Sequence, residues 1–463
     1  MSQLNEPIAI VGMGCLFPES ESLQDYWSLI KNGKDTIKEI PYTHWNPEDY
    51  YDKDPKAPDQ TYGKTGGFLK THKFNPLHYG ISPQAIEATD TTQLLGMVVA
   101  EQALKNAGYG PDEDFNRDRV SCILGVTGTL ELVIPLGARL GHPIWKKALL
   151  KAGIEEQKAN EIVDDVSQSY VPWQEASFPG LLGNVVAGRI ANRFNLGGTN
   201  SVVDAACASS LSAIRTAVME LESGRADMVI TGGMDTFNDI FMYMCFSKTP
   251  ALSPTGEAKP FDAKGDGTVL GEGLGAVVVK RLSDAERDGD RIFSVLKSIG
   301  SSSDGKGKAI YAPSSKGQMK ALRNAYREAG ISPATVELVE CHGTGTKVGD
   351  GIELEALKEV FKAEGREGAW CTLGSVKSQI GHTKAAAGAA GFIKSAMALY
   401  HKVLPPTIKV TEPHPKLLDS PFIVREHATP WMPPENHPRR AGVSAFGFGG
   451  SNFHCVLEDV FSH

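Results

Sequence analysis

The chain of 463 residues lacks a long hydrophobic run, an excess of basic residues and closely paired cysteines. No apolar stretch approaches the roughly 20 residues that a membrane-spanning helix requires. The formal net charge of −8 argues against nucleic acid as the main partner, because neutralising phosphates requires an excess of Lys and Arg. The first residues, MSQLNEPIAIVGMG, have no basic segment before an apolar one and so do not predict a secretion signal. We therefore expect a cytoplasmic protein with no membrane span and no nucleic acid partner.

The seven cysteines are too scattered for a disulfide framework or a structural zinc site, since none belongs to a Cys-x-x-Cys pair. Free cysteine is among the most buried residue types, so the first expectation for each is a small core side chain. For Cys455, in an apolar run near the C-terminus, that expectation stands. Cys207 is the exception, because its neighbours favour a chemical role.

Strand-like runs alternate with helical patterns along the whole chain, which is typical of an α/β protein with a mixed sheet covered by helices. IAIVGMG precedes LQDYWSLIKNG, for example, and WCTLGSVKS precedes AAAGAAGFIKSAMALYHK. Each half contains a β-branched strand that ends at a reactive residue near a Gly-rich turn. This echo predicts two pseudo-duplicated halves, residues 1–262 and 263–463. Polar, helix-prone residues 131–180 interrupt the pattern, and we interpret them as a helical insertion in the first half.

The stretch VDAACASSLSAI places Cys207 where β-branched residues give way to a helical pattern. Apolar residues at 211, 214, 218 and 221 keep helical spacing. Cys207 is therefore predicted in the first turn of a helix, where free N–H groups and the helix dipole stabilise a thiolate. The flanking alanines leave room for a bulky acyl group. This position alone leaves a nucleophile and an inert core cysteine equally open.

A nucleophile needs proton-handling neighbours, and two of the twelve histidines have suitable surroundings. His342 ends a strand-like run in VELVECHGTGT, and His382 lies in GSVKSQIGHTKAAAG, five residues after Lys377. Glycines beside both histidines let a ligand approach the backbone closely. GVSAFGFGGSNFHC adds a Gly-rich turn whose N–H groups could converge on an oxyanion. Cys207 and the two histidines come from three remote loops without a short-spaced pair, so we expect no metal.

These motifs together resemble the β-ketoacyl synthases, the condensing domains of fatty acid and polyketide synthases. The resemblance covers nearly the whole chain and rests on PIAIVGMGCLFP, DAACASSLSAI, HGTGTKVGDGIELEAL, GSVKSQIGHTKAAAGAAGFIK and GVSAFGFGGSNFH. It implies a thiolase-like fold, with the two halves in a layered αβαβα sandwich. SFPGLLGNVVAGRIANRF and MYMCFSKTPALS resemble in particular the ketosynthases of polyunsaturated fatty acid synthases and their iterative relatives of glycolipid and enediyne synthases.

The resemblance implies a decarboxylative Claisen condensation, in which an acyl chain is extended with malonyl from an acyl carrier protein. In that reaction Cys207 accepts the acyl group, and His342 and His382 support decarboxylation. Lys377 would organise the two histidines. No cofactor is implied, because the substrates are carried on the phosphopantetheine of the carrier protein.

Further residues match the family's substrate-binding positions. The N–H of Phe448, next to Gly449, would complete an oxyanion hole with that of Cys207, and its ring would act as a gate. The residues implied in holding phosphopantetheine are Thr344, Thr346, Ser451 and Asn452. The implied partners are the acyl carrier protein, other domains or subunits of a multi-domain synthase, and a second copy that pairs through NSVVDAA. The insertion at 131–180 would help to line the acyl pocket.

The chain departs from the family pattern at three places. AACASS replaces the usual TACSSS, and Gly351 stands where a proline usually follows GD. Gly391 stands where some branches have a glutamate, so Lys377 needs another carboxylate, with Asp350 and Glu353 as candidates. None of these departures removes a reacting atom.

Two other functions remain open from the sequence alone. A ketosynthase-like module can be a non-elongating scaffold, a chain-length partner or a transacylating gate, but such modules usually lack the cysteine or the first histidine. Cys207 and His342 are both present. A biosynthetic thiolase typically has a second reactive cysteine near the Gly-rich loop, for which Cys455 is a poor candidate in its apolar run.

Overall fold

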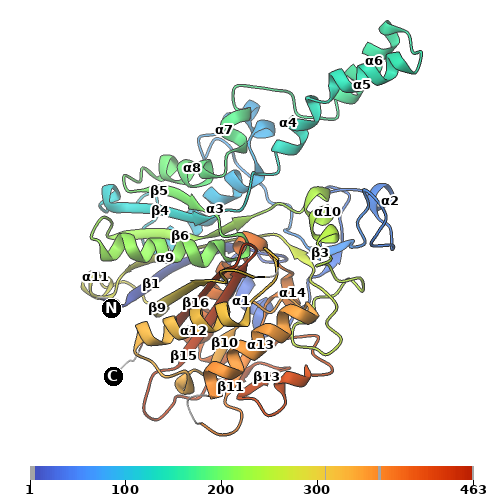
Figure 1. Ribbon diagram of the computed structural model, residues 1–463. Helices are drawn as coiled ribbons and strands as arrows, with labels where there is room; N and C mark the ends of the chain where they lie inside the picture. Colours follow the sequence, from blue (N-terminus) through green and yellow to red (C-terminus); the bar gives the residue numbers. More distant parts are fainter. Residues whose placement is uncertain (1–5, 308, 363–365, 461–463) are drawn as a thin grey trace.

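The computed structural model describes residues 6–307, 309–362 and 366–460 (Figure 1). Its centre is a mixed sheet of eleven strands in the order β13-β11-β10-β15-β16-β9-β1-β8-β6-β4-β5. The strands of the N-terminal half are β1 (Ile8–Leu16), β4 (Val120–Gly125), β5 (Asn200–Val203), β6 (Met228–Asp235) and β8 (Gly273–Arg281). Those of the C-terminal half are β9 (Ser294–Ser303), β10 (Leu338–Glu340), β11 (Cys371–Gly374), β13 (Phe422–Val424), β15 (Arg440–Gly447) and β16 (Ser451–Glu458).

The two halves repeat one topology. β1-β8-β6-β4-β5 and β9-β16-β15-β10-β11 follow the same order when the strands of each half are counted along the chain. Both begin with two antiparallel pairs and continue with two parallel pairs. The halves join where three residues of β1 pair with β9. The repeat includes β8 with the strands of the first half, because β8 pairs with both β1 and β6.

Helices lie between the two halves of the sheet and on both outer faces, which gives the five layers of an αβαβα sandwich (Figure 1). Helix α15 (Ala387–His401) of the inner layer is buried along nearly its whole length, and its alanines and glycines allow close packing of helix against sheet. The inner helices are α9 (Ser209–Glu222) and α15; the outer helices are α3 (Thr91–Ala107), α8 (Asn184–Phe194), α12 (Ser315–Ala329) and α13 (Lys347–Lys362).

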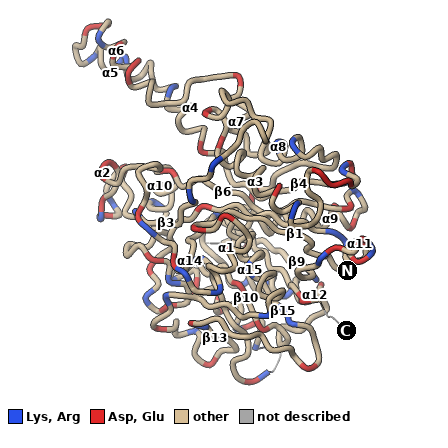
Figure 2. Tube along the Cα trace, turned by 180° about the vertical axis from the view of Figure 1, so that it is seen from behind, with Lys and Arg blue, Asp and Glu red and all other residues tan. Residues whose placement is uncertain are grey.

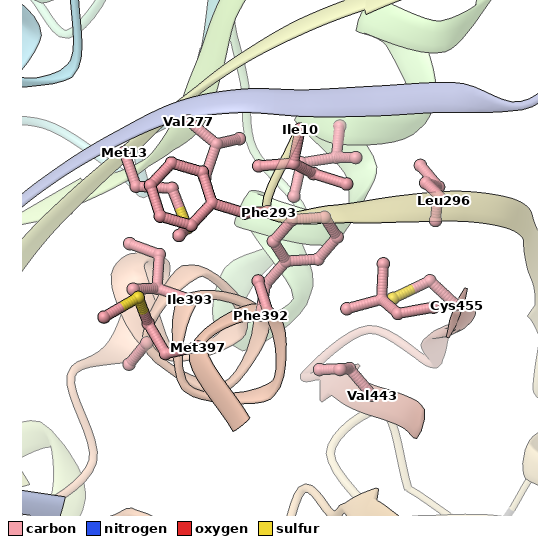
Figure 3. Packing of buried hydrophobic residues seen from close by; sticks show 14 of the residues in the cluster. Ile10, Met13, Val277, Phe293, Leu296, Phe392, Ile393, Met397, Val443 and Cys455 are labelled. Carbon is pink, nitrogen blue, oxygen red and sulfur yellow. The ribbon is translucent and has the colours of Figure 1, made fainter. Parts of the chain in front are cut away.

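The central core forms where α15 meets strands of both halves (Figure 3). Phe392 of α15 and Phe293, which precedes β9, pack there with Ile10 of β1. Cys455 of β16 belongs to the same cluster and is fully buried, so the predicted core role of this cysteine is confirmed.

Residues 131–180 are helical, as predicted. They form α4 (Val133–Arg139), α5 (His142–Lys151), α6 (Glu156–Ser167) and α7 (Ser177–Leu181). α5 and α6 pack against each other and project from the body as an arm (Figure 1).

Smaller elements complete the chain around the central sheet. β2 (Lys38–Glu39), β3 (Thr65–Gly67) and β7 (Leu270–Gly271) form a small sheet, and β12 (Val403–Leu404) pairs with β14 (Thr429–Pro430). The other helices are α1 (Leu23–Lys31), α2 (Pro47–Tyr50), α10 (Ile240–Lys248), α11 (Leu282–Asp288) and α14 (Lys377–Ile380). Charged residues of both signs are distributed around the outer loops and helices (Figure 2). No helix within the described residues has the length and apolarity needed to cross a membrane.

Candidate active site

Cys207 lies on a short 3-10 turn, Ala206–Ala208, between β5 and α9. Ala206 has a left-handed φ of +50°, a conformation that costs a non-glycine residue about 1–3 kcal/mol. Neighbouring side chains hold it in place. Asp204 Oδ1 accepts the Ala206 N–H at 2.9 Å, and Ser209 Oγ donates to the Ala206 carbonyl at 2.6 Å. The strained turn therefore fixes the position of Cys207.

The predicted thiolate is wrong for the resting protein. α9 begins at Ser209, so Cys207 precedes the α-helix instead of lying in its first turn. Burial raises the pKa of the Cys207 thiol to about 11, although the Lys377 ammonium lowers it. The cost of burying the charge exceeds the stabilisation that the Lys377 ammonium provides. Cys207 is a protonated thiol at neutral pH.

His342 and His382 face each other with ring centroids 5.5 Å apart and ring planes at 86°. His342 follows β10, and His382 follows the short helix α14, which comes after β11. Glu353 of α13 positions the first of them, because its carboxylate accepts the N–H groups of His342 and Gly343, each at 2.7 Å. Sequence positions 40 apart thus meet in space, as the resemblance implied.

Both imidazoles are neutral, with the proton on Nε2. Burial lowers the pKa of each ring well below its usual range, and the Lys377 ammonium adds to the effect. Nδ1 of His382 accepts the Lys384 N–H at 3.0 Å, and Nδ1 of His342 accepts the Phe446 N–H at 3.4 Å. A neutral ring that accepts at Nδ1 carries its hydrogen on Nε2. The site therefore contains two uncharged hydrogen-bond donors.

Lys377 contacts the backbone of the first histidine and has no carboxylate of its own. Its Nζ donates to the His342 carbonyl at 2.6 Å. Within the described residues it forms no ion pair, and the two candidates from the sequence instead bind backbone N–H groups, Glu353 as above and Asp350 those of Gly345 and Phe261. Burial lowers the pKa of Lys377, and nearby carboxylates oppose this effect.

Glu340, the last residue of β10, explains why residue 391 is a glycine. A Cβ on Gly391 would lie 2.9 Å from Glu340 Cγ. The Glu340 carboxylate accepts the Val376 N–H at 2.6 Å and pairs with Lys394 Nζ at 2.5 Å. It thereby supports the backbone immediately before Lys377. The sequence reasoning missed this pair, although a single lysine in the apolar pattern of α15 was a signal.

A cavity of about 340 Å³ brings the predicted residues together. Cys207, His342 and His382 all line it. Thr344 and Thr346 line it as well, and their hydroxyl oxygens lie 2.9 Å apart. The three remote motifs of the sequence therefore form one site.

The Gly-rich turn lies directly against the segment that carries Cys207. A Cβ on Gly447 would lie 2.1 Å from the Ala205 carbonyl oxygen, so only glycine permits this approach. Phe448 follows, 46% exposed, and Gly449 has a φ of +93° and donates its N–H to the Ile310 carbonyl at 3.0 Å. The backbones of Phe448 and Cys207 are thus neighbours.

Ser451 and Asn452 differ in their placement. Asn452 lines the cavity, but its side-chain amide donates to Asp304 Oδ1 at 2.7 Å. Ser451 is not among the lining residues and begins β16, where it pairs with Gly447 and Ser303. The structure therefore brings Asn452 to the site and leaves Ser451 beside it.

A second cavity, of about 330 Å³, also opens onto Cys207. Phe448 and Phe246 line both cavities, and their rings are stacked with centroids 6.2 Å apart. No residue from 131–180 lines either cavity, so the expectation that the insertion shapes the pocket is wrong, because the arm points away from the body. The walls that belong to the second cavity alone include Phe237, Phe241, Met242 and Cys245.

The arrangement suits acyl transfer to sulfur. A buried thiol lies at the junction of two cavities, beside two neutral imidazole donors and one lysine. Among the described residues, no group of three or more His, Cys, Asp or Glu side chains is arranged to hold a metal ion. Neutral donors in a buried site stabilise an oxygen on which negative charge develops.

The chain is similar to parts of large synthases. It is 42% identical, over 99% of its length and 16% of the relative's, to one subunit of the polyunsaturated fatty acid synthase of Thraustochytrium sp.. It is 36% identical, over 98% of its length and 8% of the relative's, to polyketide synthase PksN of Bacillus subtilis. The chain thus spans less than a fifth of either curated relative.

Solved structures and family models agree with these relatives. A ketosynthase from module 6 of the bacillaene synthase of Bacillus subtilis matches with a TM-score of 0.85 and 34% identity, covering 99% of this chain and 72% of that one. An oxazolomycin ketosynthase domain from Streptomyces albus matches with a TM-score of 0.85 and 29% identity, covering 99% and 75%. The models of the N-terminal and C-terminal β-ketoacyl synthase domains match residues 5–285 and 293–411. These matches agree with the geometry described above. The chain therefore belongs to the β-ketoacyl synthase family, the acyl-transferring condensing enzymes with a thiolase-like fold.

Proposed function

We propose that this chain extends an acyl group bound to Cys207 by decarboxylative Claisen condensation with malonyl on an acyl carrier protein. The observation that carries the proposal is the single cavity lined by Cys207, His342 and His382. No metal or organic cofactor takes part in the proposed steps.

Loading comes first. The Cys207 sulfur attacks the thioester carbonyl of a carrier-bound acyl group, the carrier thiol leaves with the proton of Cys207, and an acyl-cysteine remains. The N–H groups of Cys207 and Phe448 are proposed to bind the oxyanion of the tetrahedral intermediate. A single donor of this kind typically lowers a barrier by roughly 3–4 kcal/mol.

Condensation follows at the two histidines. Malonyl thioester loses carbon dioxide, and the electrons of the broken bond form an enolate whose oxygen accepts hydrogen bonds from Nε2 of His342 and His382. The enolate carbon then attacks the acyl-cysteine carbonyl. The Cys207 sulfur leaves and is reprotonated, and the β-ketoacyl product remains on the carrier. Neutral rings suit this step, because they donate hydrogen bonds without protonating the enolate carbon.

The two cavities are proposed to hold different parts of the substrates. The cavity with Thr344 and Thr346 would hold the phosphopantetheine arm of the carrier, assisted by Asn452 and, less directly, by Ser451. The cavity lined by α10 would hold the acyl chain. Phe448 lines both cavities and would act as the gate between them.

The relatives support a place within a larger assembly. Because they are synthases much longer than this chain, we propose that it acts with an acyl carrier protein and other synthase domains or subunits in polyunsaturated fatty acid or polyketide biosynthesis, in the cytoplasm. β5 is the terminal strand of the sheet, and an unpaired strand edge is a template for pairing with another chain. A homodimer through β5 is therefore proposed.

Two measurements test the function. Incubation with an acyl thioester should add the acyl mass to the peptide containing Cys207, and Cys207→Ala should abolish the adduct. Release of carbon dioxide from malonyl-carrier should require His342 and His382. Acylation without carbon dioxide release in the wild-type chain would favour a transacylating gate, and persistence of the adduct in Cys207→Ala would refute the nucleophile.

A further inference from the structure

Lys384, two residues after His382, has an unusual backbone and a buried charge. Its φ is +52°, in the left-handed region, and it is only 3% exposed. A non-glycine residue keeps such a conformation only where its surroundings over-determine it. The backbone N–H of Lys384 donates to Nδ1 of His382 at 3.0 Å. The strained residue therefore supplies the hydrogen bond that determines the tautomer of the histidine.

The Lys384 side chain is anchored by three acceptors. Nζ donates to Asn238 Oδ1 and to the Gly271 carbonyl, both at 2.8 Å, and lies 3.2 Å from Asp235 Oδ1. An ammonium has three hydrogens, so these partners use all of them. The other carboxylate oxygen of Asp235 accepts the Ala385 N–H at 3.2 Å. Asp235 thus holds both the lysine side chain and the backbone that follows it.

We propose that the Asp235–Lys384 ion pair is a positioning device that fixes the tautomer of His382. By anchoring the side chain of residue 384, the pair holds its backbone N–H against Nδ1, which leaves the ring hydrogen on Nε2. The inference rests on the proposed part of His382 in decarboxylation.

The surroundings of the ring explain why such a device is needed. His342 and Lys377 face it from other elements, Lys384 follows it in the chain, and the cavity separates it from Cys207. None of these groups selects one ring nitrogen, since they act through charge or through the shared cavity. Without the N–H at Nδ1, the ring hydrogen can move to Nδ1 or a second proton can bind there. Either change removes a neutral Nε2 donor from part of the molecules.

Lys384→Gly tests the anchor separately from the backbone angle. Glycine adopts φ +52° without strain, so the turn can still form, but the side-chain contacts with Asp235, Asn238 and Gly271 are lost. We expect carbon dioxide release from malonyl-carrier at pH 7 to fall at least about tenfold, since an incorrect tautomer alone can disable a histidine. Acylation of Cys207 should change less than about threefold. The rate should also gain an acidic limb, decreasing from pH 8 to pH 6, because the released Nδ1 binds a proton.

Asp235→Asn provides a second test of the proposal, which does not depend on whether Lys384→Gly folds. Asparagine keeps the size of the side chain and weakens the anchor, so carbon dioxide release should fall by a smaller factor, about threefold. No new acidic limb is expected, because the uncompensated Lys384 ammonium lowers the pKa of His382 further. Lys280→Met is the matched control. Lys280 is 3% exposed, and its Nζ lies 2.6 Å from Asp290 Oδ2 in another buried ion pair of the N-terminal half. It should lower the melting temperature and leave the pH profile of the folded enzyme unchanged.

His382→Ala separates failure of this inference from failure of the proposed function. If His382→Ala keeps wild-type carbon dioxide release, the part proposed for the histidine is wrong. If His382→Ala loses that activity while Lys384→Gly keeps the wild-type rate and a flat profile, or Asp235→Asn keeps the wild-type rate, the positioning device is refuted.

Discussion

Cys207 and Lys377 are coupled by charge across the active site, although they come from different halves of the chain. The Lys377 ammonium is the strongest of the nearby groups that favour the thiolate, yet burial prevails and the pKa of Cys207 is raised to about 11. Cys207, the proposed nucleophile, is therefore a thiol at neutral pH. It becomes reactive in a site that already holds a buried cation and two neutral imidazoles.

Alkylation of Cys207 should accordingly be slow at neutral pH and rise with pH. The thiolate is the nucleophile, and its fraction increases about tenfold per pH unit below the pKa. Iodoacetamide labelling of the Cys207 peptide, followed by mass spectrometry from pH 7 to pH 9, checks this. Lys377→Met should slow the labelling further, because it removes the charge that favours the thiolate. A rate that stays constant over this range would instead indicate the thiolate expected from the helix start.

Decarboxylation should have no acidic limb above pH 6.5. The active rings are neutral, and burial lowers the pKa of both His342 and His382 well below 6.5. Protonation, and with it loss of activity, therefore occurs only below that value. The same shift affects stability: below pH 6.5 the unfolded chain binds protons that the folded rings exclude, so the contribution of these two rings to stability decreases as the pH falls. Glu353, whose pKa burial raises to about 7, contributes in the opposite direction. Carbon dioxide release and melting temperature from pH 5 to pH 8 measure both effects. A midpoint of activity near pH 7 would contradict the neutral pair.

Removing one partner of the buried ion pair between Glu340 and Lys394 should strongly destabilise the protein. Both side chains are at most 3% exposed, so Lys394→Met leaves an uncompensated carboxylate. We expect a loss of about 3–5 kcal/mol in urea unfolding, with partial recovery in Glu340→Gln/Lys394→Met. Lys158→Met is the control, because its pair with Glu161 is more than half exposed and should contribute less than about 1 kcal/mol. Equal losses in the free energy of unfolding for Lys394→Met and Lys158→Met would show that burial of the Lys394 ion pair does not matter.

The sequence predicted which side chains meet in the cavity because each stands in a local motif. Cys207, His342 and His382 lie beside small residues at the end of strand-like runs, and that pattern is visible without coordinates. The order of the strands in the sheet could not be predicted, because the alternation of strands and helices does not show which strands pair.

Long-range ion pairs and burial were not visible in the sequence. Asp235 and Lys384 belong to different halves, and the sequence around each residue does not indicate that the other is its partner. The resting state of Cys207 was predicted wrongly for a related reason. A helix start can be read from the apolar spacing, but the desolvation that raises the pKa depends on residues from the whole fold.

The chain departs from the family pattern at Gly351 and Gly391. Replacing these two glycines with alanine should change the stability of the protein in opposite directions. Gly391→Ala places a Cβ 2.9 Å from Glu340 Cγ, and overpacking of this kind costs about 1–3 kcal/mol. Gly351 lies inside α13, and a Cβ there would have no neighbour nearer than 3.7 Å. Gly351→Ala should stabilise the helix by about 0.5–1 kcal/mol. Chemical denaturation of both variants measures the difference. Stabilisation by Gly391→Ala would show that residue 391 is free to carry a side chain.

Met242 of α10 should limit the length of the acyl chain that Cys207 accepts. It lines the second cavity, whose volume is about 330 Å³. Met242→Trp fills part of this space. Loading of a twelve-carbon acyl thioester should fall at least tenfold relative to a four-carbon one, as measured by mass spectrometry of the Cys207 peptide.

Ile144→Trp on α5 is the control for this change, because the residue is 70% exposed on the arm and lines neither cavity. It should leave the preference between the two chain lengths unchanged. If Ile144→Trp reduced loading of the long chain and Met242→Trp did not, the arm would be shown to line the acyl pocket. Equal loss of both chain lengths in Met242→Trp would mean that the acyl chain lies outside the cavity formed by α10.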